Sequence, residues 1–234
     1  RAARPELVRE LSNPNQWRRL TAQRLLVERQ DHVATPLLKN LARDGQSPLG
    51  RLHALWTLRG LGALDESLVL NALADPHPGL RENALILSES FKLRESKTLP
   101  SKILALANDP SPRVRFQAAL TIGEFENPGN PVALLEVVRR DYRFHWSRLA
   151  VLSSLRAGAS EIFRSLLADA NFHQTPDADK TALVRELADL IGARAGKNET
   201  NGIAIVLTTL AETNLSESWL IGALEGLQTG LTRQ

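Results

Sequence analysis

One short pattern recurs along the whole chain and limits what it can fold into. In its clearest copy, Asp109 and Pro110 suit a turn, Pro112 suits the first turn of a helix, and Arg115 follows Asp109 by six residues. Ala118 lies three residues further on, at helical spacing. The copies are anchored at Arg19, Arg51, Arg81, Arg115, Arg148, Arg185 and, in a degenerate form, Leu220. Because the anchors are 32, 30, 34, 33, 37 and 35 residues apart, the sequence predicts a tandem array of small units.

The position six residues before each anchor carries an acid or an amide in most copies. Its occupants are Asn13, Asp75, Asp109, Asp179 and, before the degenerate anchor, Asn214; the exceptions are Gly45 and Tyr142, which follow Asp44 and Asp141 directly. An Asp such as Asp109 can cap the helix that follows, and it can bond with an Arg of its own or a neighbouring unit. We therefore predict a structural ladder formed by Asn13, Arg19, Arg51, Asp75, Arg81, Asp109, Arg115, Arg148, Asp179 and Arg185.

Small residues follow most anchors by three positions, which would let helices approach closely. They are Ala22, Ala54, Ala84, Ala118 and Ala188. Second helical stretches with apolar residues at helical spacing lie between the anchors, at 32–42, 66–74, 99–108, 131–139, 161–168 and 203–212. Pro36 interrupts the first of these, so that helix is expected to begin at Pro36 or just before it.

No stretch alternates apolar and polar residues cleanly, so no sheet is expected. The predicted fold is all-α: an α-solenoid of about seven helix pairs, forming a single array over residues 1–234 with irregular first and last units. The polar connections at 172–179 and 192–202 are expected to be the longer loops. Gly45, Tyr142 and the 172–179 connection break the repeated pattern, so they are the places where a function outside the fold is expected.

Composition excludes several classes of protein. The chain has no cysteine, which removes disulfides, thiolate metal sites and a cysteine nucleophile. Its formal net charge is only +3, and no block of like charges suggests a nucleic-acid arm. No apolar run is long enough to span a membrane, and no signal peptide is present. Because the sequence begins at Arg1, we expect it to be a fragment of a larger protein whose location this segment does not reveal.

The residue types that usually carry catalysis or bind metals are not grouped here. The five histidines are His32, His53, His77, His145 and His173, and none has a close metal-ligand spacing. With no methionine, the segment cannot supply a Met ligand to a haem. Asp177 and Asp179 lie in a predicted turn and fit helix capping better than acid–base chemistry. We therefore expect no catalytic, cofactor-binding or metal-binding residue, and no cofactor, in this segment.

Tryptophans near the anchors are the best candidates for contact with another molecule. Trp17 and Trp146 begin anchor helices and are expected to pack between units, with stacking on nucleic-acid bases as the alternative. His53 and Trp56 share one helix. The candidate interaction surface is accordingly Trp17, His53, Trp56 and Trp146. Acids interleave with the basic residues, as in the pair Arg81 and Glu82, which disfavours nucleic acid.

Two levels of resemblance follow from these residues. An Asp-Pro turn with an Arg six residues after the Asp resembles the HEAT repeat over nearly the whole chain. The phrases at 17–26, 51–58, 61–65 and 146–154 resemble the HEAT-repeat region of large haem-binding, dehydrogenase-like proteins of planctomycetes and verrucomicrobia. That resemblance implies a secreted protein in which a HEAT array joins an N-terminal propeller resembling sugar dehydrogenases to a C-terminal cytochrome-c-type domain. The Cys-x-x-Cys-His motif that attaches haem is absent from this segment.

The expected function is that of a non-catalytic scaffold or protein-interaction module. The resemblance implies that its partners are neighbouring domains of the same chain or another protein, that it is secreted or periplasmic, and that it links the propeller to the cytochrome domain. We expect a monomer. Two alternatives remain open: a nucleic-acid-binding module of the DNA glycosylase type, and a free-standing cytosolic adaptor.

Overall fold

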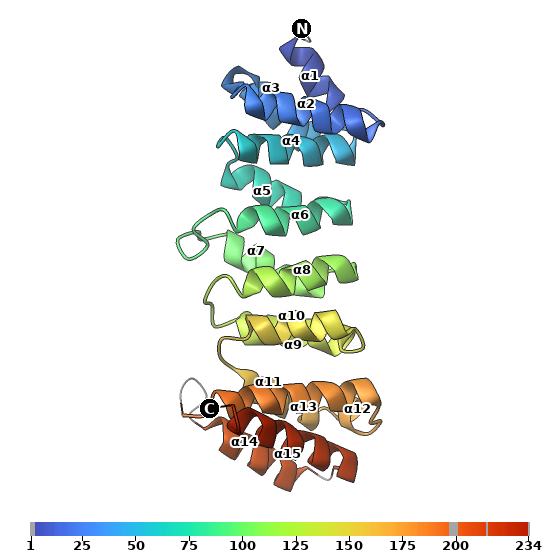
Figure 1. Ribbon diagram of the computed structural model, residues 1–234, viewed down its shortest axis with the longest axis vertical. Helices are drawn as coiled ribbons and strands as arrows, with labels where there is room; N and C mark the ends of the chain where they lie inside the picture. The colour runs from blue at the N-terminus through green and yellow to red at the C-terminus, as the bar shows by residue number, and fades with distance from the viewer. Residues whose placement is uncertain (1–2, 197–200, 214, 234) are drawn as a thin grey trace. The chain divides into compact units, whose positions relative to one another are not determined.

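The computed structural model describes residues 3–196, 201–213 and 215–233, and these residues fold into helices without any strand (Figure 1). The predicted all-α, α-solenoid fold is confirmed. The chain divides into two compact units, Arg1–Ile103 and Leu104–Gln234, called unit 1 and unit 2 below. None of the described helices is long and apolar enough to cross a membrane.

Unit 1 stacks helix pairs. Its elements are α1 (Arg4–Glu10), α2 (Gln16–Glu28), the 3₁₀ helix η1 (His32–Ala34), α3 (Thr35–Asp44), α4 (Pro48–Gly60), α5 (Glu66–Leu73) and α6 (Pro78–Ser88). α1 packs on α2, α3 on α4 and α5 on α6, while α2 also contacts α4 and α4 contacts α6. The anchor helices α2, α4 and α6 therefore form one layer of the stack.

Unit 2 is also built from packed helices. The sequence boundary between the two units falls within α7 (Leu99–Ala105), after Ile103. The other elements are the 3₁₀ helix η2 (Leu106–Asn108), α8 (Pro112–Ile122), α9 (Asn130–Asp141), α10 (His145–Ser154), α11 (Ala159–Ala168), α12 (Ala170–His173), α13 (Ala178–Ala193), α14 (Gly202–Glu212) and α15 (Glu217–Leu231). α8 packs on α10, α10 on α13, and α13 on α15. We call the helices that carry the anchors the first helices: α2, α4, α6, α8, α10, α13 and α15.

Proline and short polar residues explain where the first helices begin. Pro48, Pro78 and Pro112 each occupy the first helical position, where the missing N–H breaks no helical bond. Asp109 does not cap α8 as expected. The N-cap is Ser111, and Asp109 Oδ1 accepts a hydrogen bond from the Ser111 N–H at 2.8 Å, one residue before the helix starts. The Asp therefore closes the turn that leads into the helix.

The second helices fall close to their predicted ranges. α3 begins at Thr35, one residue before Pro36, as expected. The 99–108 stretch splits into α7 and η2. The 172–179 connection is shorter than predicted because α12 occupies its start. Part of the 192–202 connection, and Asn214, lie outside the described residues.

The core lies between the helix layers within each unit. The alanines that follow the anchors, Ala22, Ala54, Ala84, Ala118 and Ala188, are almost completely buried. Larger aliphatic side chains such as Leu55 and Leu85 in unit 1 and Leu166 and Leu187 in unit 2 fill the space around them. Burying these side chains between neighbouring pairs stabilises the stack, since no single pair could cover its own apolar face.

Candidate interaction surface

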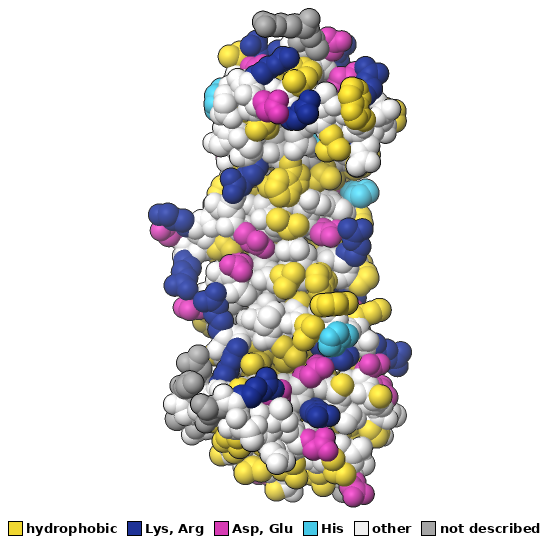
Figure 2. Space-filling view, viewed as in Figure 1, with side chains coloured by type: hydrophobic (Ala, Val, Ile, Leu, Met, Phe, Trp, Pro, Cys, Tyr) yellow, Lys and Arg dark blue, Asp and Glu magenta, His cyan; other side chains and the backbone are white. Residues whose placement is uncertain are grey.

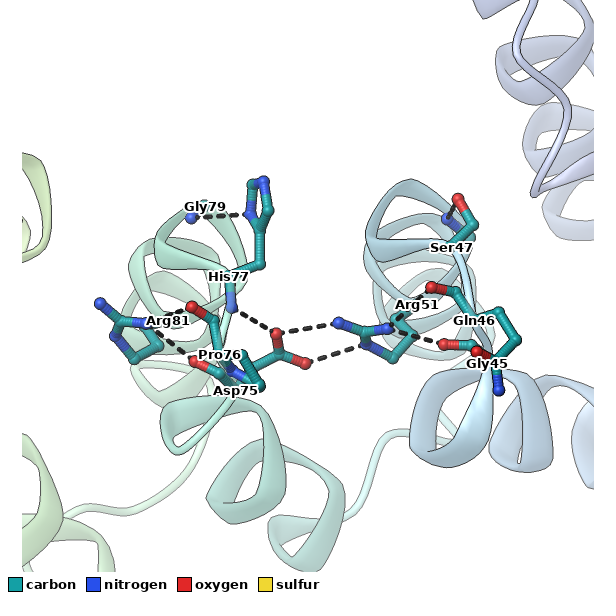
Figure 3. A network of polar contacts seen from close by, with 10 residues as sticks. Gly45, Gln46, Ser47, Arg51, Asp75, Pro76, His77, Gly79 and Arg81 are labelled. Carbon is teal, nitrogen blue, oxygen red and sulfur yellow. Dashed lines mark hydrogen bonds and ion pairs between the residues drawn. The ribbon is translucent and has the colours of Figure 1, made fainter.

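The ladder is best seen around Arg51 in unit 1 (Figure 3). Arg51 Nη1 donates to the carbonyl oxygens of Gly45 at 2.7 Å and Gln46 at 3.4 Å, in the turn before its own helix. Its Nε and Nη2 donate to the two carboxylate oxygens of Asp75, both at 2.9 Å. Arg81 in turn donates to the carbonyl oxygens of Asp75 at 2.8 Å and Pro76 at 3.0 Å. Arg51 thus holds its own turn through backbone carbonyls and reaches the acid of the next repeat.

An equivalent Arg–Asp contact between two repeats is more deeply buried in unit 2. Arg115 Nη1 donates to the carbonyl oxygens of Asp109 at 2.7 Å and Pro110 at 3.1 Å. Its Nε and Nη2 donate to the two carboxylate oxygens of Asp141 at 2.7 and 2.6 Å, and both side chains are buried. The hydrogen bonds with Asp141 raise the pKa of Arg115, so the guanidinium is a permanent charge.

The backbone contact explains why Gly45 and Tyr142 can break the sequence pattern. Arg148 Nη1 donates to the Tyr142 carbonyl at 2.8 Å, just as Arg51 does to that of Gly45. A carbonyl is present whatever the side chain, so the contact with the Arg requires no acid at these two positions. The acid of a turn instead accepts hydrogen bonds from the Arg of the preceding repeat. Asp141 accepts them from Arg115 in this way, although it lies one position earlier than the pattern predicts. Both exceptions are thereby accounted for by the fold.

Arg148 pairs with the acid that the spacing suggests, Asp179, and more closely with a second acid, Glu186. Its Nε and Nη2 donate to Glu186 at 2.9 and 3.3 Å, and its Nη1 lies 3.5 Å from Asp179 Oδ1. Glu186 belongs to the helix of the next repeat rather than to its turn. Sequence spacing missed Glu186 because it considered only acids six residues before an anchor.

In the sixth repeat Lys180, and not Arg185, holds the turn. Lys180 is buried, and its Nζ donates at 2.9 Å each to the carbonyl oxygens of Phe172 and Thr175 and to the Thr175 hydroxyl. Arg185 is exposed and pairs with Glu225 at 3.6 Å. Lys180 lies 32 residues after Arg148, which restores the regular spacing. Within unit 1 the turn carbonyls bind Arg19, Arg51 and Arg81, and within unit 2 they bind Arg115 and Arg148. Lys180 takes the place that the spacing gave to Arg185.

At the N-terminal end, a histidine replaces the acid. Arg19 Nη1 donates to the carbonyl oxygens of Asn13 and Pro14, while its Nε donates to His53 Nε2 at 3.1 Å. The Nδ1 of His53 lies 2.6 Å from Gln23 Oε1. This arrangement fits a neutral imidazole that carries its proton on Nδ1. Burial, and then the charge of Arg19, lower the pKa of His53 below its ordinary value of 6.5.

The lowered pKa of His53 predicts that the stability of unit 1 depends on pH. The unfolded chain binds a proton on His53 near pH 6.5, whereas the folded chain binds it only at lower pH. Stability from this contact is therefore complete above pH 6.5 and is lost as the pH falls from there through the lower folded pKa. Thermal melts between pH 7.5 and 5.0 should show this loss, and H53Q should flatten it. An equal pH dependence in H53Q would contradict the assignment.

The four tryptophans have separate environments. Trp219 is fully buried, and its Nε1 donates to the His173 carbonyl at 3.0 Å. Trp56 is partly buried, and its Nε1 donates to Asn83 Oδ1 on α6 at 3.0 Å. Trp17 and Trp146 are 72% and 71% exposed. The prediction that Trp17 and Trp146 pack between units is therefore wrong, since both indoles face solvent.

Apolar residues that are exposed or partly exposed recur on the first helices. They lie at fixed positions relative to the ladder Arg of each repeat. Two residues before it lie Trp17, Leu49 and Trp146; one residue after it lie Leu20, Leu52, Phe116 and Leu149; five residues after it lie Trp56, Ile86 and Leu120. All of them are exposed or partly exposed. We call this set the first-helix face, and we describe it separately within each unit. Of this set the sequence reasoning found only the tryptophans, although aligning the repeats on the Arg would have revealed the rest.

Comparison with known proteins agrees with this geometry. Residues 99–126 match the family model described as HEAT repeat. The chain is also similar to YibA of Escherichia coli, whose X-ray structure aligns with 97% of this chain and 93% of that one, at 17% identity and a TM-score of 0.54. That likeness supports the fold alone. Among curated protein sequences, no match to the chain is found.

In the part of the chain that the structure describes, the helical stack does not bring catalytic or metal-binding side chains together. There, no three His, Cys, Asp or Glu side chains gather in a way that could hold a metal ion. The ladder carboxylates are engaged with guanidinium groups, as Asp75 is with Arg51 and Asp141 with Arg115. The arrangement is therefore suited to holding helices in register and to presenting an apolar face.

Proposed function

We propose that this segment is a non-catalytic HEAT-repeat scaffold that binds protein through its first-helix face. The observation that carries the proposal is the exposure of Trp17 and Trp146, each accompanied by exposed leucines at repeating positions. Large apolar side chains that face water at regular intervals are typical of interaction surfaces, and tryptophan is enriched where interfaces are tightest.

The proposed partners are neighbouring domains of the same, longer polypeptide. This part of the proposal rests on the resemblance to the secreted haem-binding proteins, in which a HEAT array lies between a propeller and a cytochrome-c-type domain. It includes a secreted or periplasmic location, a monomeric state and a continuous array over residues 1–234. A gene whose flanking sequence lacks both an upstream signal peptide and a downstream Cys-x-x-Cys-His motif would refute this part and favour the cytosolic adaptor.

The charges beside the exposed indoles favour protein over nucleic acid. Arg18 is paired with Glu10 at 2.9 Å, and Arg24 lies 3.7 Å from Glu28. Arg19 is buried in the ladder. Cations beside Trp17 are thus matched by carboxylates, which would repel a phosphate backbone.

Hydroxyl-radical footprinting tests the proposal on the chain alone and on the full-length protein. We expect Trp17 and Trp146 to be oxidised readily in the isolated segment and at least several-fold more slowly in the full-length protein. His32, which is exposed on η1 away from the first helices, is the control and should react equally in both. Trp219 should stay protected in both, because it is buried.

Two results would contradict the proposal. Equal oxidation of Trp17 and Trp146 in both proteins would show that no flanking domain covers the face. Salt-sensitive binding of a labelled DNA duplex by the isolated segment, abolished by Trp17→Ala, would favour the nucleic-acid alternative instead.

A further inference from the structure

An apolar groove of about 470 Å³ lies on the first-helix face of unit 2. Its lining includes Phe116 and Leu120 from α8, Trp146 and Leu149 from α10, and Leu190 and Arg194 at the end of α13. Hydrophobic side chains gather over α8 and α10 on the face shown in Figure 2. This groove is part of the first-helix face of unit 2.

The groove has one charged lining residue, and it is a cation. Arg194 Nη1 donates to the Leu155 carbonyl, and Arg194 forms no ion pair with any carboxylate in the described part of the chain. Leu155 directly follows α10, so Arg194 lies at the end of the groove where α10 and α13 finish. Trp146 lies at the beginning of α10. The groove therefore runs from the exposed Trp146 indole to the Arg194 guanidinium, which has no carboxylate partner among the described residues.

The chemistry of the walls selects the backbone conformation of an occupant. The lining helices satisfy their own backbone N–H and C=O groups, and the lining side chains are mostly aliphatic or aromatic. An extended peptide buried here would leave its own N–H and C=O groups without partners, at a cost of about 1–3 kcal/mol for each. A helix satisfies those groups internally and can lay an apolar face into a groove between helices.

We propose that this groove binds an amphipathic helix of a partner protein, with an Asp or Glu at one end of the apolar face to pair with Arg194. The proposal rests on the proposed protein-binding function and names the kind of segment that the face receives. Charge complementarity decides the orientation, because the carboxylate must lie at the Arg194 end and the apolar residues toward Trp146.

Selection of a phage-displayed library of random 16-residue peptides on the full 234-residue chain tests this directly. We expect the enriched peptides to carry apolar residues at positions i, i+3 or i+4 and i+7 with an Asp or Glu at one end. Their affinity, measured by fluorescence anisotropy, should fall at least tenfold in R194E and in W146A. R194Q is a second variant with a smaller change in charge, and it should weaken binding in the same direction.

A charge reversal supplies the decisive comparison. Changing the peptide's acid to Lys should weaken its binding to the unmodified chain and restore at least fivefold of its binding to R194E. R164E makes the same charge change at an exposed position of α11, and V132A removes an exposed apolar side chain from α9. Both variants should bind the selected peptides normally.

Several outcomes would overturn the inference. They are enrichment of peptides without an acid, equal weakening by R194E and R164E, absence of rescue, and absence of any enriched peptide. A concentration-dependent dimer that W146A abolishes would assign the groove to a second copy of the chain. Because the footprinting result concerns the full-length protein, protection of Trp146 there together with failed charge reversal would reject this inference and leave the proposed function standing.

Discussion

Replacing Arg115 with Ala is expected to lower the free energy of unfolding of unit 2 by about 3–5 kcal/mol. The substitution removes both hydrogen bonds to the Asp141 carboxylate, which is then left buried without its counter-charge. It also releases the carbonyl oxygens of Asp109 and Pro110, which Arg115 holds in the preceding turn. Urea unfolding followed by circular dichroism provides the measurement.

Arg185 supplies a matched control for this experiment. It was assigned to the same repeat position from spacing alone, yet it is exposed and makes only a long ion pair with Glu225. Arg185→Ala should therefore change stability by less than about 1 kcal/mol. Equal losses in R115A and R185A would contradict the ladder described here. In a double-mutant cycle, Arg115→Ala and Asp141→Ala should show strong coupling, since each removes the other's partner.

Replacing Gly226 or Gly230 with Ala is expected to destabilise unit 2 by about 1–3 kcal/mol each. In an ordinary helix this change would stabilise by up to about 1 kcal/mol, because Ala is the better helix former. Here α13 and α15 approach through their backbones. A methyl group at Gly226 would overlap the Arg185 carbonyl oxygen, and one at Gly230 would overlap that of Asp189.

The helix itself provides the control. Gln228 lies between the two glycines on the exposed side of α15, so Gln228→Ala should leave stability almost unchanged. Thermal unfolding of the three variants, followed by circular dichroism, distinguishes the cases. Stabilisation by G226A would show that the two helices do not approach this closely.

Periodicity predicted the helices well because helix formation depends on local spacing and on the position of proline. The turn carrying Asp109 and the start of α3 near Pro36 both follow from the sequence alone. The close contact of α13 with α15 does not follow from the sequence alone, because a helical glycine indicates close packing only when the position of the neighbouring backbone is known.

The ladder was predictable in its composition and less so in its connections. Spacing identified Arg51, Asp75 and Arg115, since these residues recur with the repeat, but it did not include Asp141, which lies one position earlier than the pattern places the acid. It assigned Arg185 in place of Lys180 because the search required Arg, whereas a lysine ammonium can donate to the same backbone carbonyls. It could not show that Arg51 and Arg115 reach forward to an acid of the next repeat, because that depends on how the helix pairs stack and not on sequence distance.

The interaction surface was the least predictable feature. Trp17 and Trp146 occupy equivalent repeat positions, and nothing in their immediate sequence distinguishes an indole that is buried from one that faces water. Their exposure depends on which side of the first helix the neighbouring pair covers. Arg194 was missed for the same reason, since it meets Trp146 and Leu190 around one groove only after three helices are stacked.

The contacts that Asp75 makes with two successive repeats also indicate how such an array can change in length. This residue offers its carboxylate to Arg51 of the repeat before it and its carbonyl to Arg81 of its own repeat. This one turn therefore binds the Arg of the preceding repeat through a side chain and the Arg of its own repeat through a backbone carbonyl. A duplicated repeat would bring both contacts with it and would join its neighbours without any compensating substitution, so the array can be lengthened by whole repeats at such a turn.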